Sequence, residues 1–143
     1  MKRSFLAMAI VACASSKAPD AVIEDFRAVE RQCIVAFNGA LRDERAHKLD
    51  EVGVAAAVER DVLGPWRAMA ARVAAAPEPA GKHELYALMR RYVGERLEAW
   101  EAYVAGLRAT SEADARPKLD LYHQKNADAQ EDAQVLGAQL RSY

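Results

Sequence analysis

Apolar residues recur at spacings of three and four along most of this chain, a pattern typical of helices that pack on one side. The pattern predicts helices over residues 20–45, 50–76 and 83–109, and a fourth helix that opens at a Ser111–Asp114 capping pattern. No stretch alternates apolar and polar residues regularly enough to predict a strand. Four long helices joined by short loops predict an all-α fold, an up-down-up-down four-helix bundle.

The second helical pattern is interrupted by Gly64-Pro65. Proline lacks the backbone N–H and its ring collides with the preceding turn, so we expect a kink in this helix. On the fourth helix, Asn126 occupies a position of the otherwise apolar stripe, where a buried amide can fix the register. Charged pairs such as Glu24/Arg27 and Arg91/Glu95 are expected on solvated faces.

Composition agrees with a single globular domain, since 52% of the 143 residues are apolar and 29% are charged. Twenty Lys and Arg residues nearly balance 21 Asp and Glu residues, giving a net charge of -1, so no nucleic-acid partner is predicted. No segment approaches the roughly 20 apolar residues of a membrane-spanning helix. A polytopic membrane protein is therefore not expected.

The first fourteen residues have the pattern of an export signal. A short basic start, Lys2 and Arg3, precedes an apolar run over residues 5–12, and small and then polar residues follow. Ala12 and Ala14 suit an ordinary signal-peptidase site with cleavage after Ala14. The same run also fits the first turns of a cytosolic helix, which leaves that alternative open.

Residues 10–13, IVAC, resemble the lipobox of bacterial lipoproteins, with two branched apolar residues, a small residue and a cysteine. The resemblance implies cleavage before Cys13, a diacylglycerol on its sulfur and an acylated amine, and two or more chains anchor a protein stably. The residue after Cys13 is Ala14 and not the Asp of inner-membrane retention, which favours the outer membrane. The expected divisions are a signal peptide (1–12), a polar tether (13–19) and a periplasm-facing bundle domain (20–143).

The second cysteine, Cys33, falls on the apolar stripe of the first predicted helix. If Cys13 is removed or acylated, Cys33 is the single thiol and no intramolecular disulfide can form. We expect it to be a small core residue.

Two acid-x-x-His patterns are the main candidates for metal chemistry. Glu44 and His47 lie at the end of the first predicted helix, and Asp120 and His123 lie near the start of the fourth. An up-down bundle brings these ends together, and di-iron carboxylate bundles use Glu-x-x-His pairs. Both pairs lie near helix ends, where solvent competes, so we expect solvated charges and no metal site.

Nothing in the sequence predicts an enzyme or a cofactor. No Ser/His/Asp or Cys/His arrangement marks a nucleophile, and no Gly-rich phosphate loop or haem-attachment motif is present. Tyrosines and tryptophans recur at helical spacing, which is more typical of a core than of a ligand cavity.

These observations predict a lipid-anchored protein of the bacterial cell envelope that binds another envelope protein without catalysis. The expected partner-binding surface is at Pro65 and Trp66, where a kinked helix could leave an apolar patch exposed. Two alternatives are a carrier for a metal or small ligand, and an immunity or inhibitor protein for an envelope toxin.

Overall fold

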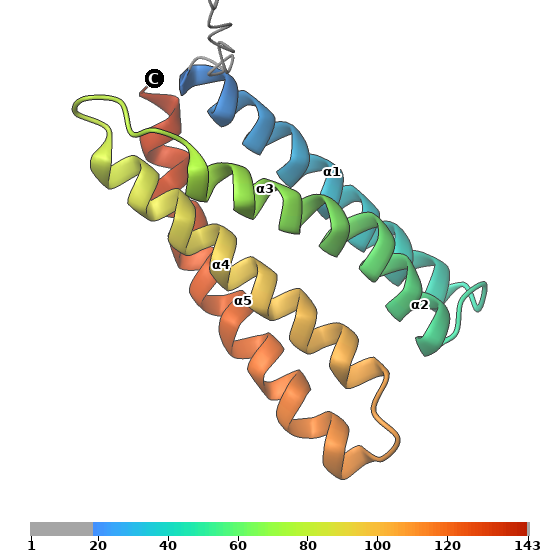
Figure 1. The fold of residues 1–143 in the computed structure, drawn as a ribbon. Coiled ribbons are helices and arrows are strands. Elements are labelled where there is room, and N and C mark those ends of the chain that lie inside the picture. The colour runs from blue at the N-terminus through green and yellow to red at the C-terminus, as the bar shows by residue number, and fades with distance from the viewer. Residues whose placement is uncertain (1–18, 143) are drawn as a thin grey trace, which may run out of the picture.

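The computed structural model describes residues 19–142 and confirms the all-α four-helix bundle. The leader, Cys13 and nearly all of the tether lie outside the described residues. The helical elements are α1 (Pro19–Arg45), α2 (Glu51–Val58), a π-helical segment (Glu59–Leu63), α3 (Gly64–Ala75), α4 (His83–Leu107) and α5 (Glu112–Arg141). In Figure 1, α1 lies beside the rod formed by α2 and α3, and α4 lies beside α5.

We call the rod formed by α2, the π-helical segment and α3 the second rod; its helical backbone continues from α2 into α3 without a break. The Gly64 N–H donates to the carbonyl of Glu59, five residues back, which is the wider π-helical pattern. Pro65 follows in the first turn of α3, where a missing N–H is tolerated. The interruption expected at Gly64-Pro65 is thus a local change in hydrogen bonding, while the kink stays a prediction.

Polar caps set the starts of two helices. Asp50 accepts the Gly53 N–H at 2.7 Å and caps α2. Ser111 accepts the Asp114 N–H at 3.2 Å and caps α5, at the position that the sequence predicts. These caps satisfy N–H groups that have no partner inside the helix.

An aromatic cluster occupies the middle of the core, where α1, α3 and α4 meet. The Trp66 ring makes T-shaped contacts with Tyr92 and Trp100, at centroid distances of 6.0 and 5.3 Å. Phe26 reaches the same cluster from α1, 5.9 Å from Tyr92. The Trp66 Nε1–H donates to the Val93 carbonyl at 2.9 Å, so its one polar atom is satisfied inside the core.

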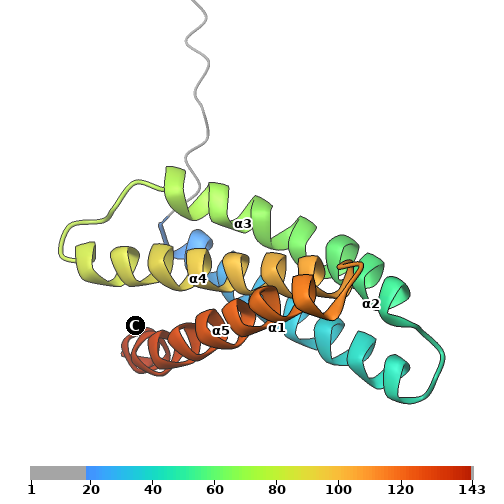
Figure 2. The same ribbon diagram turned by 90° about the horizontal axis from the view of Figure 1, so that it is seen from below.

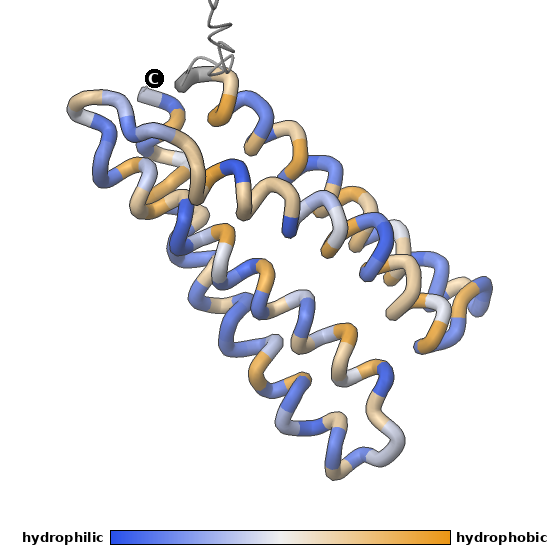
Figure 3. The backbone as a smooth tube through the Cα atoms, viewed as in Figure 1, coloured by the Kyte–Doolittle hydropathy of each residue, from blue (hydrophilic) through white to orange (hydrophobic). Residues whose placement is uncertain are grey.

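Helix α5 packs on α4 and carries few buried residues (Ala129, Asp132, Leu136 and Leu140). Apolar residues are interspersed with hydrophilic ones along its length (Figure 3). Polar links therefore supplement its packing: Arg91 pairs with Asp132, and Lys125 pairs with Glu98 at 2.6 Å. Arg91 thus bonds across to α5 and forms no ion pair with Glu95, the partner expected on its own helix.

The two ends of the described chain lie at the same end of the bundle (Figure 1). Arg27 of α1 donates to the carbonyl of Leu140 in the last turn of α5 at 2.6 Å. A cation at a helix C-terminus is favourable because the last carbonyls have no partner in the helix. None of the helices in residues 19–142 is both long enough and apolar enough to cross a membrane.

Gly106→Ala should destabilise the bundle, because the added methyl group would lie 2.6 Å from Leu119 Cδ2 and 2.9 Å from its Cγ. Overpacking of this kind lowers the free energy of unfolding by about 1–3 kcal/mol. Gly94→Ala is the matched control in the same helix, since its methyl group would meet no neighbour within 4 Å. That variant should gain about 0.5–1 kcal/mol. Urea unfolding measures both, and equal stability of the two variants would contradict the close α4–α5 approach.

Candidate functional site

The two acid-x-x-His patterns lie at the same end of the bundle but do not converge. His47 is exposed in the turn after α1, with φ of 55°, and Asp120 is exposed on α5. Glu44 is half-buried near Tyr103, whose pKa rises to about 12, chiefly through burial and then through this carboxylate. The exposed His123 ring lies 5.1 Å from that of Tyr122. Among residues 19–142, no group of three or more His, Cys, Asp or Glu side chains could hold a metal ion.

The surface expected at Pro65 and Trp66 is not formed by the tryptophan. The Trp66 side chain is fully buried, and Pro65 is half-buried at the start of α3. Trp66 lies on the buried stripe of α3 with Met69 and Val73, and its indole N–H donates to the Val93 carbonyl inside the core. Trp66 therefore stabilises the bundle and is not available to a partner in this structure.

Cys33 is a core residue, as its place on the apolar stripe predicts. Its side chain is fully buried, and the thiol donates to the Val62 carbonyl at 3.6 Å. Burial, with a smaller effect of Glu30, raises its pKa to about 11. A thiol with so high a pKa is a poor nucleophile at neutral pH.

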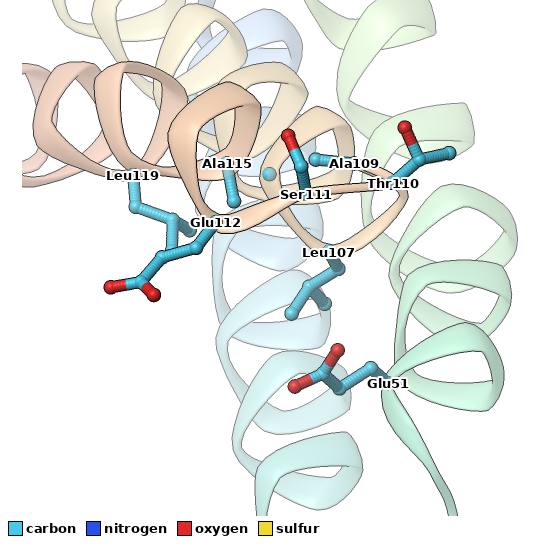
Figure 4. Close-up of a pocket in the computed structure, with 9 residues that line it drawn as sticks. Glu51, Leu107, Ala109, Thr110, Ser111, Glu112, Ala115 and Leu119 are labelled. Atoms are coloured by element: carbon cyan, nitrogen blue, oxygen red, sulfur yellow. The ribbon is translucent and has the colours of Figure 1, made fainter.

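One hollow lies at the end of the bundle where α4 turns into α5 (Figure 4). It has a volume of about 330 Å³, and its lining includes Glu51 from α2 and Glu112 from α5. The two carboxylates do not converge on a common point (Figure 4). No cation or buried polar group in its lining marks it as a site for a particular ligand.

A more distinctive hollow lies between α1 and α5, over α4. No Cα atom of α1 lies within 8 Å of a Cα atom of α5, so side chains of α4 form the floor between them. In Figure 2, the later part of α1 and the helix α5 lie on the side of α4 away from α3. We call this hollow the α1–α5 groove; it holds about 230 Å³ and is lined by Ile34, Phe37, Asn38, Arg96, Trp100, Tyr122, Asn126 and Gln130.

Arg96 is the single charged residue in the lining of the α1–α5 groove. Its Nε donates to the Tyr92 hydroxyl at 3.2 Å, and its Nη1 donates to Asn126 Oδ1 at 2.6 Å. The guanidinium carbon lies 5.6 Å from the centre of the Tyr92 ring and 5.7 Å from that of Trp100. Cations are attracted to aromatic faces at these distances. Two hydrogen bonds and two rings therefore hold the cation in one place.

A chain of polar contacts connects the groove to α1. The Tyr92 hydroxyl donates to the Glu30 carboxylate and accepts from Arg96. Burial raises the Tyr92 pKa; Arg96 opposes that rise and Glu30 adds to it, so the phenol keeps its proton. The result is a fixed order of Glu30, Tyr92, Arg96 and Asn126 across three helices.

Sequence reasoning missed Arg96 but pointed to one of its partners. Asn126 lies on the apolar stripe of α5, and a polar residue there predicts an inter-helix hydrogen bond. The structure supplies that bond from Arg96. The sequence features that could have indicated this contact are the amide of Asn126 on the stripe of α5 and the position of Arg96 next to the aromatic stripe of α4.

The chain matches no family model, no curated protein and no solved structure.

Tyr92→Phe should lower the free energy of unfolding by about 1–3 kcal/mol, because it leaves Glu30 and the Arg96 Nε without their shared partner. Tyr103→Phe is the matched control, since the Tyr103 hydroxyl forms no hydrogen bond with residues 19–142. That variant should stay within about 0.5 kcal/mol of wild type. Both are measured by urea unfolding at pH 7, and equal losses would show that the hydroxyl network contributes nothing.

Proposed function

We propose that this protein is a lipid-anchored component of the bacterial cell envelope that binds another envelope protein through the α1–α5 groove, without catalysis. The support for the anchor is the leader, in which a basic start and an apolar run end at the IVAC pattern and Cys13. The proposed orientation is toward the periplasm, with the outer membrane favoured because Ala14 follows Cys13.

The observation that carries the binding role is the position of Arg96. A half-buried cation held by neutral hydrogen-bond acceptors lies at the floor of an open groove. Partly burying a charge without an ion-pair partner costs free energy, and an opposite charge supplied by a partner would offset that cost. Ile34, 38% exposed, adds apolar surface at the rim.

The proposed partner-binding surface is the α1–α5 groove and not the second rod. The sequence favoured Pro65 and Trp66, but the indole is fully buried. The α1–α5 groove lies where α1 and α5 leave the half-buried Arg96 of α4 between them, with the nearly buried Trp100 beneath it. An immunity or inhibitor protein would use a surface of the same kind, so it is a special case of the proposed function.

The proposed anchor predicts that cells grown with an alkyne-tagged fatty acid incorporate the tag into the wild-type protein and not into Cys13→Ala. Cys33→Ala is the control, because this thiol is buried and should not affect labelling. In-gel fluorescence after click chemistry measures the label. Wild-type protein that carries no label would exclude the lipid anchor and leave cleavage after Ala14 or a retained leader.

The proposed groove predicts that a photo-crosslinking amino acid at Asn38 or Gln130, on opposite walls, captures the same protein in cells. Ala68, exposed on α3 beside Pro65, is the control position. Mass spectrometry of the adducts identifies what is captured. Adducts from position 68 with none from 38 or 130 would place the partner-binding surface on the second rod and contradict the proposed groove.

A further inference from the structure

We infer that the α1–α5 groove recognises a carboxylate beside an apolar side chain on a segment of the partner protein, with Arg96 binding the carboxylate. The inference rests on the proposed function and specifies the chemistry of the partner at that site. It is carried by the unused donors of Arg96, by the absence of a carboxylate in the groove lining, and by the aromatic and amide groups around it.

Arg96 retains donors for an incoming anion. A guanidinium has five N–H groups, and residues 19–142 supply acceptors to Nε and Nη1 but none to Nη2. Its neighbours on α4 are matched differently, since Arg90 pairs with Glu78 and Arg91 pairs with Asp132. Arg96 thus differs from both in having neutral partners. A planar guanidinium with a free edge suits a carboxylate, which can accept from it in a charge-assisted bond.

The nearby carboxylate of Glu30 does not pair with the free edge of the Arg96 guanidinium. Glu30 accepts from the Tyr92 hydroxyl, and that hydroxyl separates it from Arg96. Glu30 is also not part of the groove lining, where the polar groups besides Arg96 are the Tyr122 phenol, the Trp100 indole N–H and three amides. An anion entering the groove therefore meets a positive charge and no negative charge on its walls.

The rest of the lining accounts for the apolar and peptide character of the ligand. The half-buried Phe37 offers ring surface beside the nearly buried Trp100, and Ile34 offers an aliphatic side chain at the rim. Asn38, Asn126 and Gln130 carry amides, which both donate and accept hydrogen bonds, as peptide groups do. The volume of about 230 Å³ is below the roughly 300–1,000 Å³ of pockets that enclose a whole drug-sized ligand. It suits one or two side chains of a larger partner.

The test is a titration of the full-length protein, in detergent micelles, with two acetylated and amidated dipeptides, Phe-Glu and Phe-Gln. They differ only in the carboxylate. Phe-Glu should shift the backbone amide resonances of Asn38, Trp100 and Asn126, with a Kd near 1 mM and at least five-fold below that of Phe-Gln. The same titration with 3-phenylpropionate tests a free small carboxylate as the source.

Arg96→Gln should abolish the difference between the two dipeptides, and Arg96→Lys should retain part of it because the charge remains. Arg116→Gln is the matched control, since it removes the same charge from an exposed position of α5. Thermal melting checks that each variant is folded, and Arg96→Lys serves as the test if Arg96→Gln is not.

Equal affinity for the two dipeptides, the absence of shifts at the groove, or discrimination that survives in Arg96→Gln would each overturn the inference. If Arg96→Gln is unfolded, undiminished discrimination in Arg96→Lys would overturn it. Binding of 3-phenylpropionate as tight as that of Phe-Glu would overturn its peptide part. These outcomes are separate from the crosslinking result. A partner captured from both walls without carboxylate discrimination would keep the proposed function and remove only this inference.

Discussion

The burial of Trp66 is the constraint on which the rest of this bundle depends. A fully buried indole needs both apolar surroundings and an acceptor for its N–H, and it finds them in the rings of Phe26, Tyr92 and Trp100 and in the Val93 carbonyl. These contacts join the second rod to α4 and bring in α1 through its long aromatic side chains. Because side chains rather than close backbone packing connect α1 to α4, no Cα atom of α1 comes within 8 Å of one in α4 or α5. The α1–α5 groove is a consequence of that spacing.

The floor of the groove is the place where the aromatic core changes into a polar network. Tyr92 belongs to both, since its ring packs against Trp66 and its hydroxyl joins Glu30 to Arg96. The guanidinium is therefore positioned by the same side chain that helps to bury the tryptophan. A cation held in this way loses little conformational freedom when a partner binds, and such preorganisation favours affinity.

Much of the fold follows from periodicity, while the site depends on distances between helices that periodicity does not contain. The stripe on the first helix predicts residues 20–45, the structure has Pro19–Arg45, and Cys33 is buried as expected. The Ser111 cap is likewise readable, because a capping side chain and its N–H are three residues apart in sequence. Trp66 falls on the inward stripe of the second helix with Met69 and Val73 and is fully buried, whereas the surface expected around it rested on a kink, and periodicity does not reveal that the helix continues through a π-helical turn. Arg91 shows the same limit: its partner Asp132 is 41 residues away, so spacing along one helix favoured Glu95.

Arg96 is a preorganised and incompletely satisfied cation in this structure, and its side-chain nitrogen resonances report on how firmly it is held. In the free protein, ¹⁵N NMR of the arginine side chains measures both rotation about the guanidinium and exchange of its hydrogens with water. We expect hindered rotation and slowed Nε–H exchange for Arg96, because Tyr92 and Asn126 accept its hydrogens. The exposed Arg116 serves as the freely rotating reference in the same spectrum. Rotation and exchange of Arg96 as fast as those of Arg116 would show that Tyr92 and Asn126 do not hold the guanidinium in place.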